Sequence, residues 1–203
     1  PEIMSRGGFD AVIGNPPYIR IQAMKKWAPV EVDFYKEHYE AAKKGNYDIY
    51  VVFVEKGLGL LNERGLLGFI LPHKFFNSQY GQPLRNSLSL GDHLDKIVHF
   101  GHEQVFAGAT TYTCLLFLNK SERDHFEFVK VDDLVEWRSS GKAIKGTISA
   151  EKATEDEWNF VVGSDAELFE KLFTIEIKLS EIADIFVGLQ TSADNVFIMD
   201  LIE

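Results

Sequence analysis

The sequence predicts an α/β fold, a sheet with helices packed on its faces, and three observations support this prediction. Short apolar runs rich in β-branched and aromatic residues have the length of strands, and they lie at residues 9–14, 66–71, 96–100 and 112–118. Helical patterns fall between them, at residues 48–62 and 82–90. The composition, 45% hydrophobic with 16 phenylalanines among 203 residues, supplies enough apolar surface for a packed core.

The first strand is expected to end abruptly. Residues 9–14 form an apolar run, and Pro16 and Pro17 follow almost at once. Proline lacks the N–H that a strand ladder needs, so the strand must stop and a stiff loop must begin. The chain then shows a polar helical pattern over residues 31–45.

The second helix has the clearest apolar stripe. Over residues 48–62 apolar side chains recur at helical spacing, and we expect Asp48 to cap the helix and Gly65 to stop it. The run at 66–71 is apolar throughout and ends at Pro72, which is typical of a buried central strand. The later elements expected are a helix at 82–90, strands at 96–100, 112–118 and 125–131, helices at 132–139 and 166–173, and a β-rich stretch at 182–199.

The charge limits how this chain could meet nucleic acid. With 31 acidic and 21 basic residues it has a formal net charge of −10 and an isoelectric point near 5.1. That balance does not suit general attachment to phosphates, so any contact with DNA must use a local basic surface. The candidates are Lys25, Lys26, Lys43, Lys44, Lys74 and Arg85.

The cysteine count and the apolar runs bear on the compartment. Cys114 is the single cysteine, so an intrachain disulfide and a cysteine-based metal cluster are both excluded. The first ten residues lack the apolar core of a secretory signal, and the longest apolar run, at 49–54, is too short to cross a bilayer. We expect a cytoplasmic protein with no membrane partner.

The tetrapeptide Asn15-Pro16-Pro17-Tyr18 meets a demanding chemical specification. An aromatic amine is a poor nucleophile because its lone pair is delocalised, and hydrogen-bond acceptors on the amino hydrogens release that pair. The Asn15 side chain and the Pro16 carbonyl can both accept, and the Tyr18 ring can stack on a base. The tetrapeptide follows a strand, where an open α/β sheet places its ligands, which favours a site over a simple turn.

Four segments, in order, carry a family resemblance: FDAVIGNPPYIR at 9–20, NYDIYVVFVE at 46–55, GLLGFILPHKFF at 65–76 and VFAGATTYT at 105–113. They resemble the DNA adenine-specific methyltransferases of restriction–modification systems, the N-6 DNA methylases with an Asn-Pro-Pro-Tyr motif, of type II or IIG. The resemblance implies the C-terminal half of a Rossmann-like, S-adenosylmethionine-dependent methyltransferase sheet, acting on a flipped adenine in double-stranded DNA.

The resemblance also implies roles for single residues. Asn15, Pro16, Pro17 and Tyr18 would form the catalytic loop, with Tyr18 stacking on one side of the adenine. Phe106 would hold the other side of the base, unless it is an ordinary core aromatic. Asn15 and Asp48 would lie near S-adenosylmethionine, and the alternative for Asp48 is the helix cap.

The same resemblance predicts three parts: the catalytic half at 1–120, a connecting α/β segment at 121–178, and the start of a mainly β target-recognition domain at 179–203. The family's glycine-rich cofactor turn has no counterpart before Phe9 or later in the chain. We therefore expect a catalytic-half fragment that is inactive alone, with endonuclease and specificity domains either fused to the parent protein or separate.

Two other classes of function remain open on the sequence. A protein glutamine or RNA amino-methyltransferase faces the same lone-pair problem and could use the same loop. A non-catalytic DNA-recognition or defence subunit would fit the acidic charge and the missing cofactor turn.

Overall fold

The computed structural model describes residues 2–106, 111–175, 177 and 179–184. The chain divides into two compact units, residues 1–165 and residues 166–203. The second unit contributes two described helices, α7 (Ala166–Phe173) and α8 (Leu179–Ile182). In the described part of the chain, no helix has the length and apolar character needed to span a membrane.

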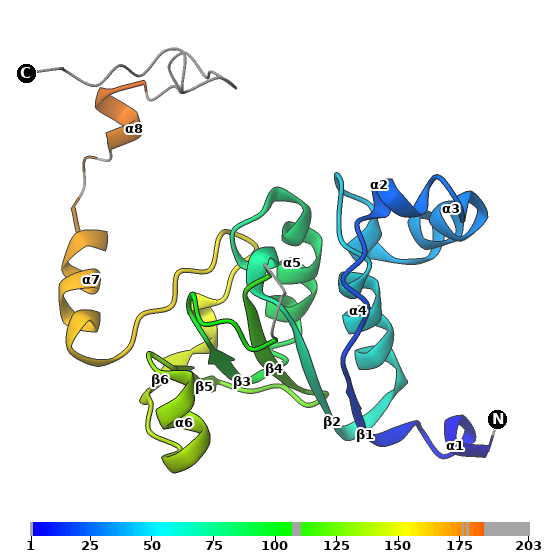
Figure 1. The fold of residues 1–203 in the computed structure, drawn as a ribbon, viewed down its shortest axis with the longest axis horizontal. Helices are drawn as coiled ribbons and strands as arrows, with labels where there is room; N and C mark the ends of the chain where they lie inside the picture. The colour runs from blue at the N-terminus through cyan, green and yellow to red at the C-terminus, as the bar shows by residue number, and fades with distance from the viewer. Residues whose placement is uncertain (1, 107–110, 176, 178, 185–203) are drawn as a thin grey trace, which may run out of the picture. The chain divides into compact units, whose positions relative to one another are not determined.

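The first unit is built on a six-stranded mixed sheet in the order β1-β2-β4-β3-β5-β6 (Figure 1). Strands β4 and β6 run against the other four, because β1 pairs in parallel with β2, and β3 with β5. The strand bounds are β1 Phe9–Gly14, β2 Leu61–Pro72, β3 Leu94–His99, β4 Thr113–Asn119, β5 His125–Lys130 and β6 Ile144–Ser149. The carboxyl ends of β1 and β2 therefore meet at the same edge of the sheet.

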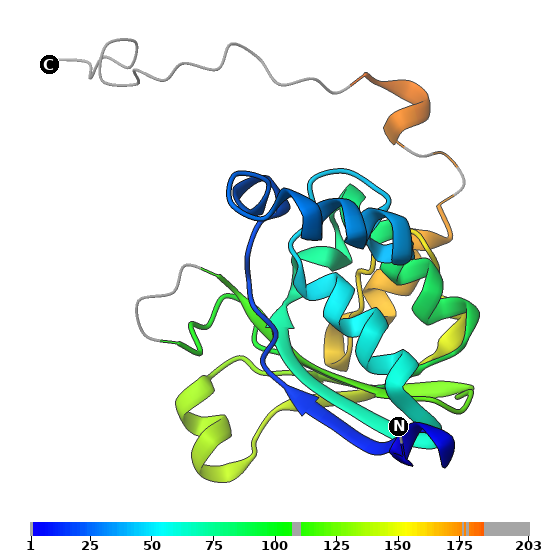
Figure 2. The same ribbon diagram turned by 90° about the vertical axis from the view of Figure 1, so that its right-hand side faces the viewer.

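Helices cover the two faces of this sheet unequally. On one face α4 (Tyr50–Leu60) and α5 (Gln82–Leu90) bury an apolar core against β2 and β4, with Leu67, Leu71 and Leu116 at its centre. The opposite face is covered over β3 and β5 by α6 (Leu134–Ser140), which lies on the other side of the sheet in Figure 2. The helices on the two faces thus cover different parts of the sheet.

The β1–β2 end of that opposite face is exposed. Side chains alternate along β2, so the residues between Leu67, Phe69 and Leu71 point away from α4. On this side Ile13 is 89% exposed and Leu66 is 48% exposed, although both are large and apolar. Among the described residues β1 pairs only with β2, so its outer edge is also free.

The remaining elements are short and lie mostly between β1 and α4 or around the strand ends. They are the helices α1 (Glu2–Ser5), α2 (Ile21–Met24) and α3 (Pro29–His38), and the 3₁₀ turns η1 (Glu40–Ala42), η2 (His73–Phe76), η3 (Gln79–Gly81), η4 (Ala150–Lys152) and η5 (Gly163–Asp165).

The α/β prediction is confirmed, and the predicted strands at 9–14, 96–100, 112–118 and 125–131 are present with small shifts of their ends. The strand predicted at 66–71 is also present, but β2 is longer and already starts at Leu61. The helix expected over 31–45 is shorter: α3 begins with Pro29 in its first turn and stops where Tyr39 becomes extended. Strand β6 was missed, since its exposed lysine-containing sequence has little apolar signal.

Two predicted helix signals are wrong. Asp48 does not cap α4, because Ile49 occupies the cap position and no side chain bonds the free N–H groups there. Gly65 does not stop the helix either: α4 ends at Leu60, β2 starts at Leu61, and Gly65 lies inside the strand. The chain turns directly from helix to strand because the backbone of Leu61 is extended.

The predicted division at residues 120 and 178 remains a prediction, and the structure adds that β5 and β6 belong to the same sheet as β1 to β4. The β-rich stretch at 182–199, predicted to open a target-recognition domain, lies almost wholly outside the described residues; only its start, 182–184, is described.

Candidate active site

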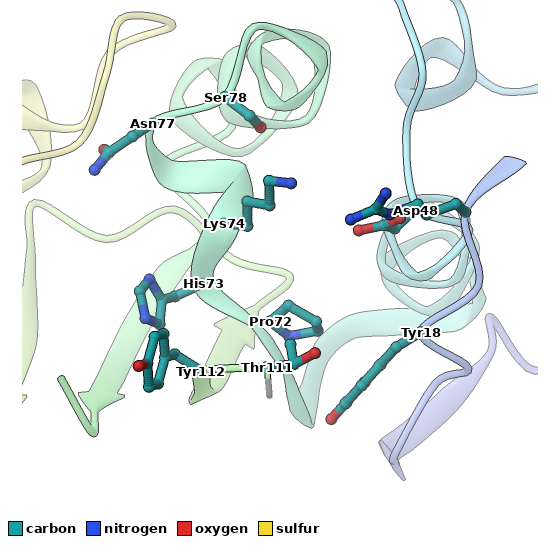
Figure 3. A pocket seen from close by; sticks show the side chains of 10 residues that line it. Tyr18, Asp48, Pro72, His73, Lys74, Asn77, Ser78, Thr111 and Tyr112 are labelled. Carbon is teal, nitrogen blue, oxygen red and sulfur yellow. The ribbon is translucent and has the colours of Figure 1, made fainter. Parts of the chain in front are cut away.

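A pocket of about 600 Å³ opens where β1 and β2 reach their carboxyl ends (Figure 3). Three stretches of chain line it. The β1 wall comes from the loop after β1 and from the segment just before α4. The β2 wall comes from the end of β2, from η2 and from the two residues after η2, and the third stretch precedes β4. The lining residues are Tyr18, Arg20 and Asp48 for the β1 wall, Pro72, His73, Lys74, Asn77 and Ser78 for the β2 wall, and Thr111 and Tyr112.

The β1 wall is held by a short antiparallel pairing. Arg20 and Asp48 form an isolated β-bridge, in which the Ile21 N–H donates to the Tyr47 carbonyl at 2.9 Å and the Ile49 N–H donates to the Ile19 carbonyl at 2.9 Å. This pairing ties the segment after the two prolines to the segment before α4. It explains how Arg20 and Asp48, far apart in sequence, face one pocket.

Two contacts hold the Tyr18 side chain in place. Its hydroxyl donates to the Ile70 carbonyl of β2 at 3.0 Å, and its ring meets the edge of Tyr50 with centroids 6.4 Å apart. Burial, with a smaller contribution from Cys114, raises the pKa of the Tyr18 hydroxyl to about 12. The hydroxyl therefore stays neutral, and the ring presents an apolar surface to the pocket.

Asp48 is a half-buried carboxylate with an unusual set of neighbours. The Tyr80 hydroxyl lies 3.4 Å from the Asp48 Oδ2, and the Tyr50 and Tyr80 hydroxyls are 3.0 Å apart behind it. Burial raises the pKa of the Asp48 carboxyl, while Lys74, Arg20 and the Tyr80 hydrogen bond each lower it. The side chain that was expected to cap α4 instead lies in the wall of the pocket.

The β2 wall is clamped from behind by Arg85. This side chain is 3% exposed, and its guanidinium donates to the carbonyls of Phe75 at 2.6 Å, Ser78 at 2.9 Å and Glu155 at 2.9 Å. Three backbone acceptors on one buried cation fix the turn between η2 and η3. Arg85 was a candidate for contacting DNA, and that prediction is wrong because the charge is buried.

Aromatic packing supports the same wall. Trp158 is 2% exposed, and its ring lies 5.7 Å from Phe75 and 5.4 Å from Phe76, the two residues that end η2. The backbone N–H of Trp158 also donates to the Phe76 carbonyl at 3.0 Å. Phe160 adds a further ring to the group.

Histidines pack where the β2 wall meets the strand β3. His73 and His99 have ring centroids 4.3 Å apart, and the Gly101 N–H donates to His99 Nδ1 at 3.0 Å. Burial is the main cause that lowers the pKa of His99 to about 4, with smaller contributions from His73, His102 and Lys130. The pKa of His73 is also lowered by burial, so both rings are neutral at neutral pH.

The structure brings only part of the predicted site into this pocket. Tyr18 and Asp48 line it, whereas Asn15 is exposed, Pro16 is buried and Pro17 is half-buried, and none of these three is a lining residue. Within the described residues, the Asn15 side chain has no hydrogen-bond partner, so its carbonyl oxygen is free to accept one.

Phe106, expected to hold the second side of the base, is 37% exposed and does not line the pocket. The residues that follow it, 107–110, are outside the described part of the chain. Tyr112, which the sequence analysis did not single out, lines the pocket instead, and its ring lies 6.4 Å from that of His73 at an angle of 22°. The signal for it was present, since Tyr112 stands directly before the apolar run of β4.

The loops at the carboxyl ends of β1 and β2 do not form a glycine-rich turn. Among the described residues, no glycine with positive φ lies in the loop directly after β1 or directly after β2. The loops at the ends of β1 and β2 carry prolines instead.

The fold matches known proteins. It resembles the methyltransferase subunit of a type I restriction–modification system from Streptococcus thermophilus, with a TM-score of 0.51, 16% identity, and coverage of 72% of this chain and 36% of that one. It also resembles a nuclease-deletion mutant of the type ISP enzyme LlaGI, with a TM-score of 0.55, 20% identity, and coverage of 78% and 19%. A class I S-adenosylmethionine-dependent methyltransferase from Listeria monocytogenes matches with a TM-score of 0.50, 16% identity, and coverage of 66% and 40%. The fold is therefore that of the Rossmann-like, S-adenosylmethionine-dependent methyltransferases.

The sequence places the chain within that class. Residues 1–106 match the model of the Eco57I restriction-modification methylase family, and the chain belongs to that family. It is 36% identical to the type II restriction enzyme and methyltransferase RM.Eco57I of Escherichia coli, over 94% of this chain and 19% of that protein. It is 26% identical to the type II methyltransferase M.BstVI of Geobacillus stearothermophilus, over 95% and 37%. The chain thus spans about a fifth of the first relative and about a third of the second.

Proposed function

We propose that the protein containing this chain transfers a methyl group from S-adenosylmethionine to the N6 amino group of an adenine in double-stranded DNA, as the modification activity of a restriction–modification system. The observation that carries the proposal is the Tyr18 ring, held in a pocket at the strand ends directly after Asn15, Pro16 and Pro17. Family membership and the names of the relatives support the same reaction.

The loop supplies what the amine chemistry requires. A free Asn15 side-chain carbonyl and the Pro16 main-chain carbonyl would accept the two amino hydrogens and draw the nitrogen towards tetrahedral geometry. S-adenosylmethionine, when bound, supplies an electrophilic methyl group, so the amine needs no strong base beforehand. Correct placement of the nitrogen then accounts for much of the rate.

The adenine would have to leave the helix to reach this pocket. Its amino group is paired in the duplex, and extrusion costs a few kcal/mol. A volume of about 600 Å³ lies within the range of small-ligand sites, and stacking on Tyr18 would return about 1–3 kcal/mol. The half-buried ring with its neutral hydroxyl suits that role.

The exposed sheet face supports a second part of the proposal, that another segment of the full protein completes this domain and holds S-adenosylmethionine. Ile13 and Leu66 together expose an apolar surface next to the free edge of β1, a combination that stable domains avoid. We expect the isolated chain to bind S-adenosylmethionine weakly and to be inactive. Calorimetric titration that showed micromolar binding to the isolated chain would contradict this.

The decisive experiment uses the full-length protein. Wild type and the Asn15→Ala variant are incubated with duplex DNA and tritiated S-adenosylmethionine, and the DNA is digested to nucleosides. We expect label in N6-methyladenine for wild type and a loss of at least about a hundredfold for the variant, the scale seen when one preorganised polar group is removed from an active site. Asn159→Ala, at an exposed asparagine outside the pocket, is the matched control and should retain activity. Label absent from methyladenine in the wild type would end the proposal.

A further inference from the structure

The rim of the pocket carries positive charge that the proposed chemistry on the base does not use. Arg20 and Lys74 line the pocket from opposite walls, and both are exposed. Figure 3 shows the Lys74 side chain extending from the β2 wall towards the side on which Asp48 lies. Two cations therefore face one carboxylate in a protein whose formal net charge is −10.

Neither cation is committed to a partner. Within the described residues, the side chains of Arg20 and Lys74 form no hydrogen bond and no ion pair, although both act electrostatically on Asp48. Two other lysines of the surface are engaged, since Lys43 pairs with Glu40 and Lys44 bonds Gln82. The two rim cations are thus free to take an external anion.

The residues that line the pocket differ in burial, with the two charged cations at the surface and the less exposed side chains deeper. Pro72 is buried, and Tyr18, Asp48 and Ser78 are partly buried, whereas Arg20 and Lys74 lie at the surface. The Ser78 hydroxyl is buried and has no hydrogen-bond partner of normal distance and angle among the described residues, although its hydrogen bonding with Tyr80 lowers the pKa of the Tyr80 hydroxyl. A buried polar group without a good partner favours a bound ligand that supplies one.

We propose that Arg20 and Lys74 form a phosphate subsite at the rim of the pocket, which binds a phosphate group of the same nucleotide whose base enters below. A base fills the apolar interior beside Tyr18, and its phosphate stays at the surface, where a guanidinium and an ammonium approach it from two walls. The subsite would supply local positive charge for a DNA phosphate on a chain whose formal net charge is −10.

This subsite rests on the proposed function, so the test separates the two. Full-length protein is titrated calorimetrically with 2′-deoxyadenosine, with its 5′-monophosphate and with its 3′-monophosphate. We expect one of the monophosphates to bind about tenfold more tightly than the nucleoside, the scale of one charge-assisted contact. The position of the favoured phosphate identifies which side of the nucleotide meets the rim.

Three variants make the comparison specific. Lys74→Gln and Arg20→Gln should each reduce the advantage of the monophosphate and should together remove it, while binding of the nucleoside stays within twofold. Lys56→Gln, at an exposed lysine of α4 outside the pocket, should leave the advantage unchanged. Monophosphates that bind no more tightly than the nucleoside, or an advantage that survives in the double variant, would overturn the subsite. Saturable nucleoside binding in that case leaves the adenine site intact, whereas absence of both nucleoside binding and methylation removes the proposed function as well.

Discussion

The two walls of the pocket are built in different ways. The β1 wall consists of a proline-stiffened loop with an exposed Asn15, held by one β-bridge and by the bond from Tyr18 to Ile70. The β2 wall rests on buried aromatic rings around Trp158 and on the guanidinium of Arg85. The β1 wall is thus held by a few backbone contacts, whereas the β2 wall is fixed by buried side chains from distant parts of the sequence.

The largest expected effect tests the support of the β2 wall. Trp158→Ala should lower the free energy of unfolding by about 3–5 kcal/mol, because it removes a buried indole from contact with Phe75 and Phe76. Urea denaturation measures it. Trp27→Ala removes an indole that is 64% exposed and should change the free energy of unfolding by no more than about 0.5 kcal/mol. Equal losses in the two variants would mean that the rings around Trp158 do not support the wall.

The second-largest expected effect is the loss of stability in acid that comes from His99, which packs against His73 of the β2 wall. The pKa of His99 is about 4 in the folded protein, below the ordinary 6.5, so the folded state disfavours the proton. Stability from this group is present above pH 6.5 and is lost as the pH falls towards 4, by about 3 kcal/mol in all.

The measurement is the free energy of unfolding at pH 7 and at pH 4.5 for wild type and for His99→Gln. The variant lacks the titrating ring and should lose less stability than wild type over this interval. Its glutamine can still accept from the Gly101 N–H, which limits the change at pH 7. Parallel pH profiles in the two proteins would show that His99 is not responsible.

The smallest effect belongs to the β1 wall. In the full-length protein, Tyr18→Ala should weaken binding of the flipped base by about 1–3 kcal/mol through lost stacking, and turnover should fall with it. Tyr18→Phe keeps the ring and loses only the bond to the Ile70 carbonyl, so its turnover should stay close to wild type. Methylation kinetics on duplex DNA compare the two variants. If both lost activity equally, the hydroxyl rather than the ring face would be the functional group.

Local sequence was sufficient to find the stiff loop after β1. Two consecutive prolines after an apolar strand can be read without any tertiary information, because proline acts on its own backbone and on its immediate neighbour. The same holds for the buried stripe of α4 and for Pro72 at the end of β2. Asp48 was predicted both to lie near the site and to cap α4, and the capping prediction is wrong. An aspartate just before a helix gives the same sequence signal whether it caps the helix or lines a pocket.

The β2 wall could not be found in this way. Arg85 looks like a surface cation by composition and becomes buried only because Phe75, Ser78 and Glu155 turn their carbonyls towards it. Trp158 meets Phe75 and Phe76 across more than 80 residues of sequence. Periodicity and local propensity do not encode which distant segments will meet.

The amino-acid sequence by itself determined the alternation of strands and helices, the stiff loop after β1 and its accepting groups, because each follows from the chemistry of neighbouring residues. Tertiary structure alone decided that Arg20, Asp48 and Lys74 would share one cavity, and that Phe106 would lie outside it while Tyr112 lies within. The physical reason is that a shared cavity depends on strand order, register and burial, which arise only when segments far apart in the chain pack together.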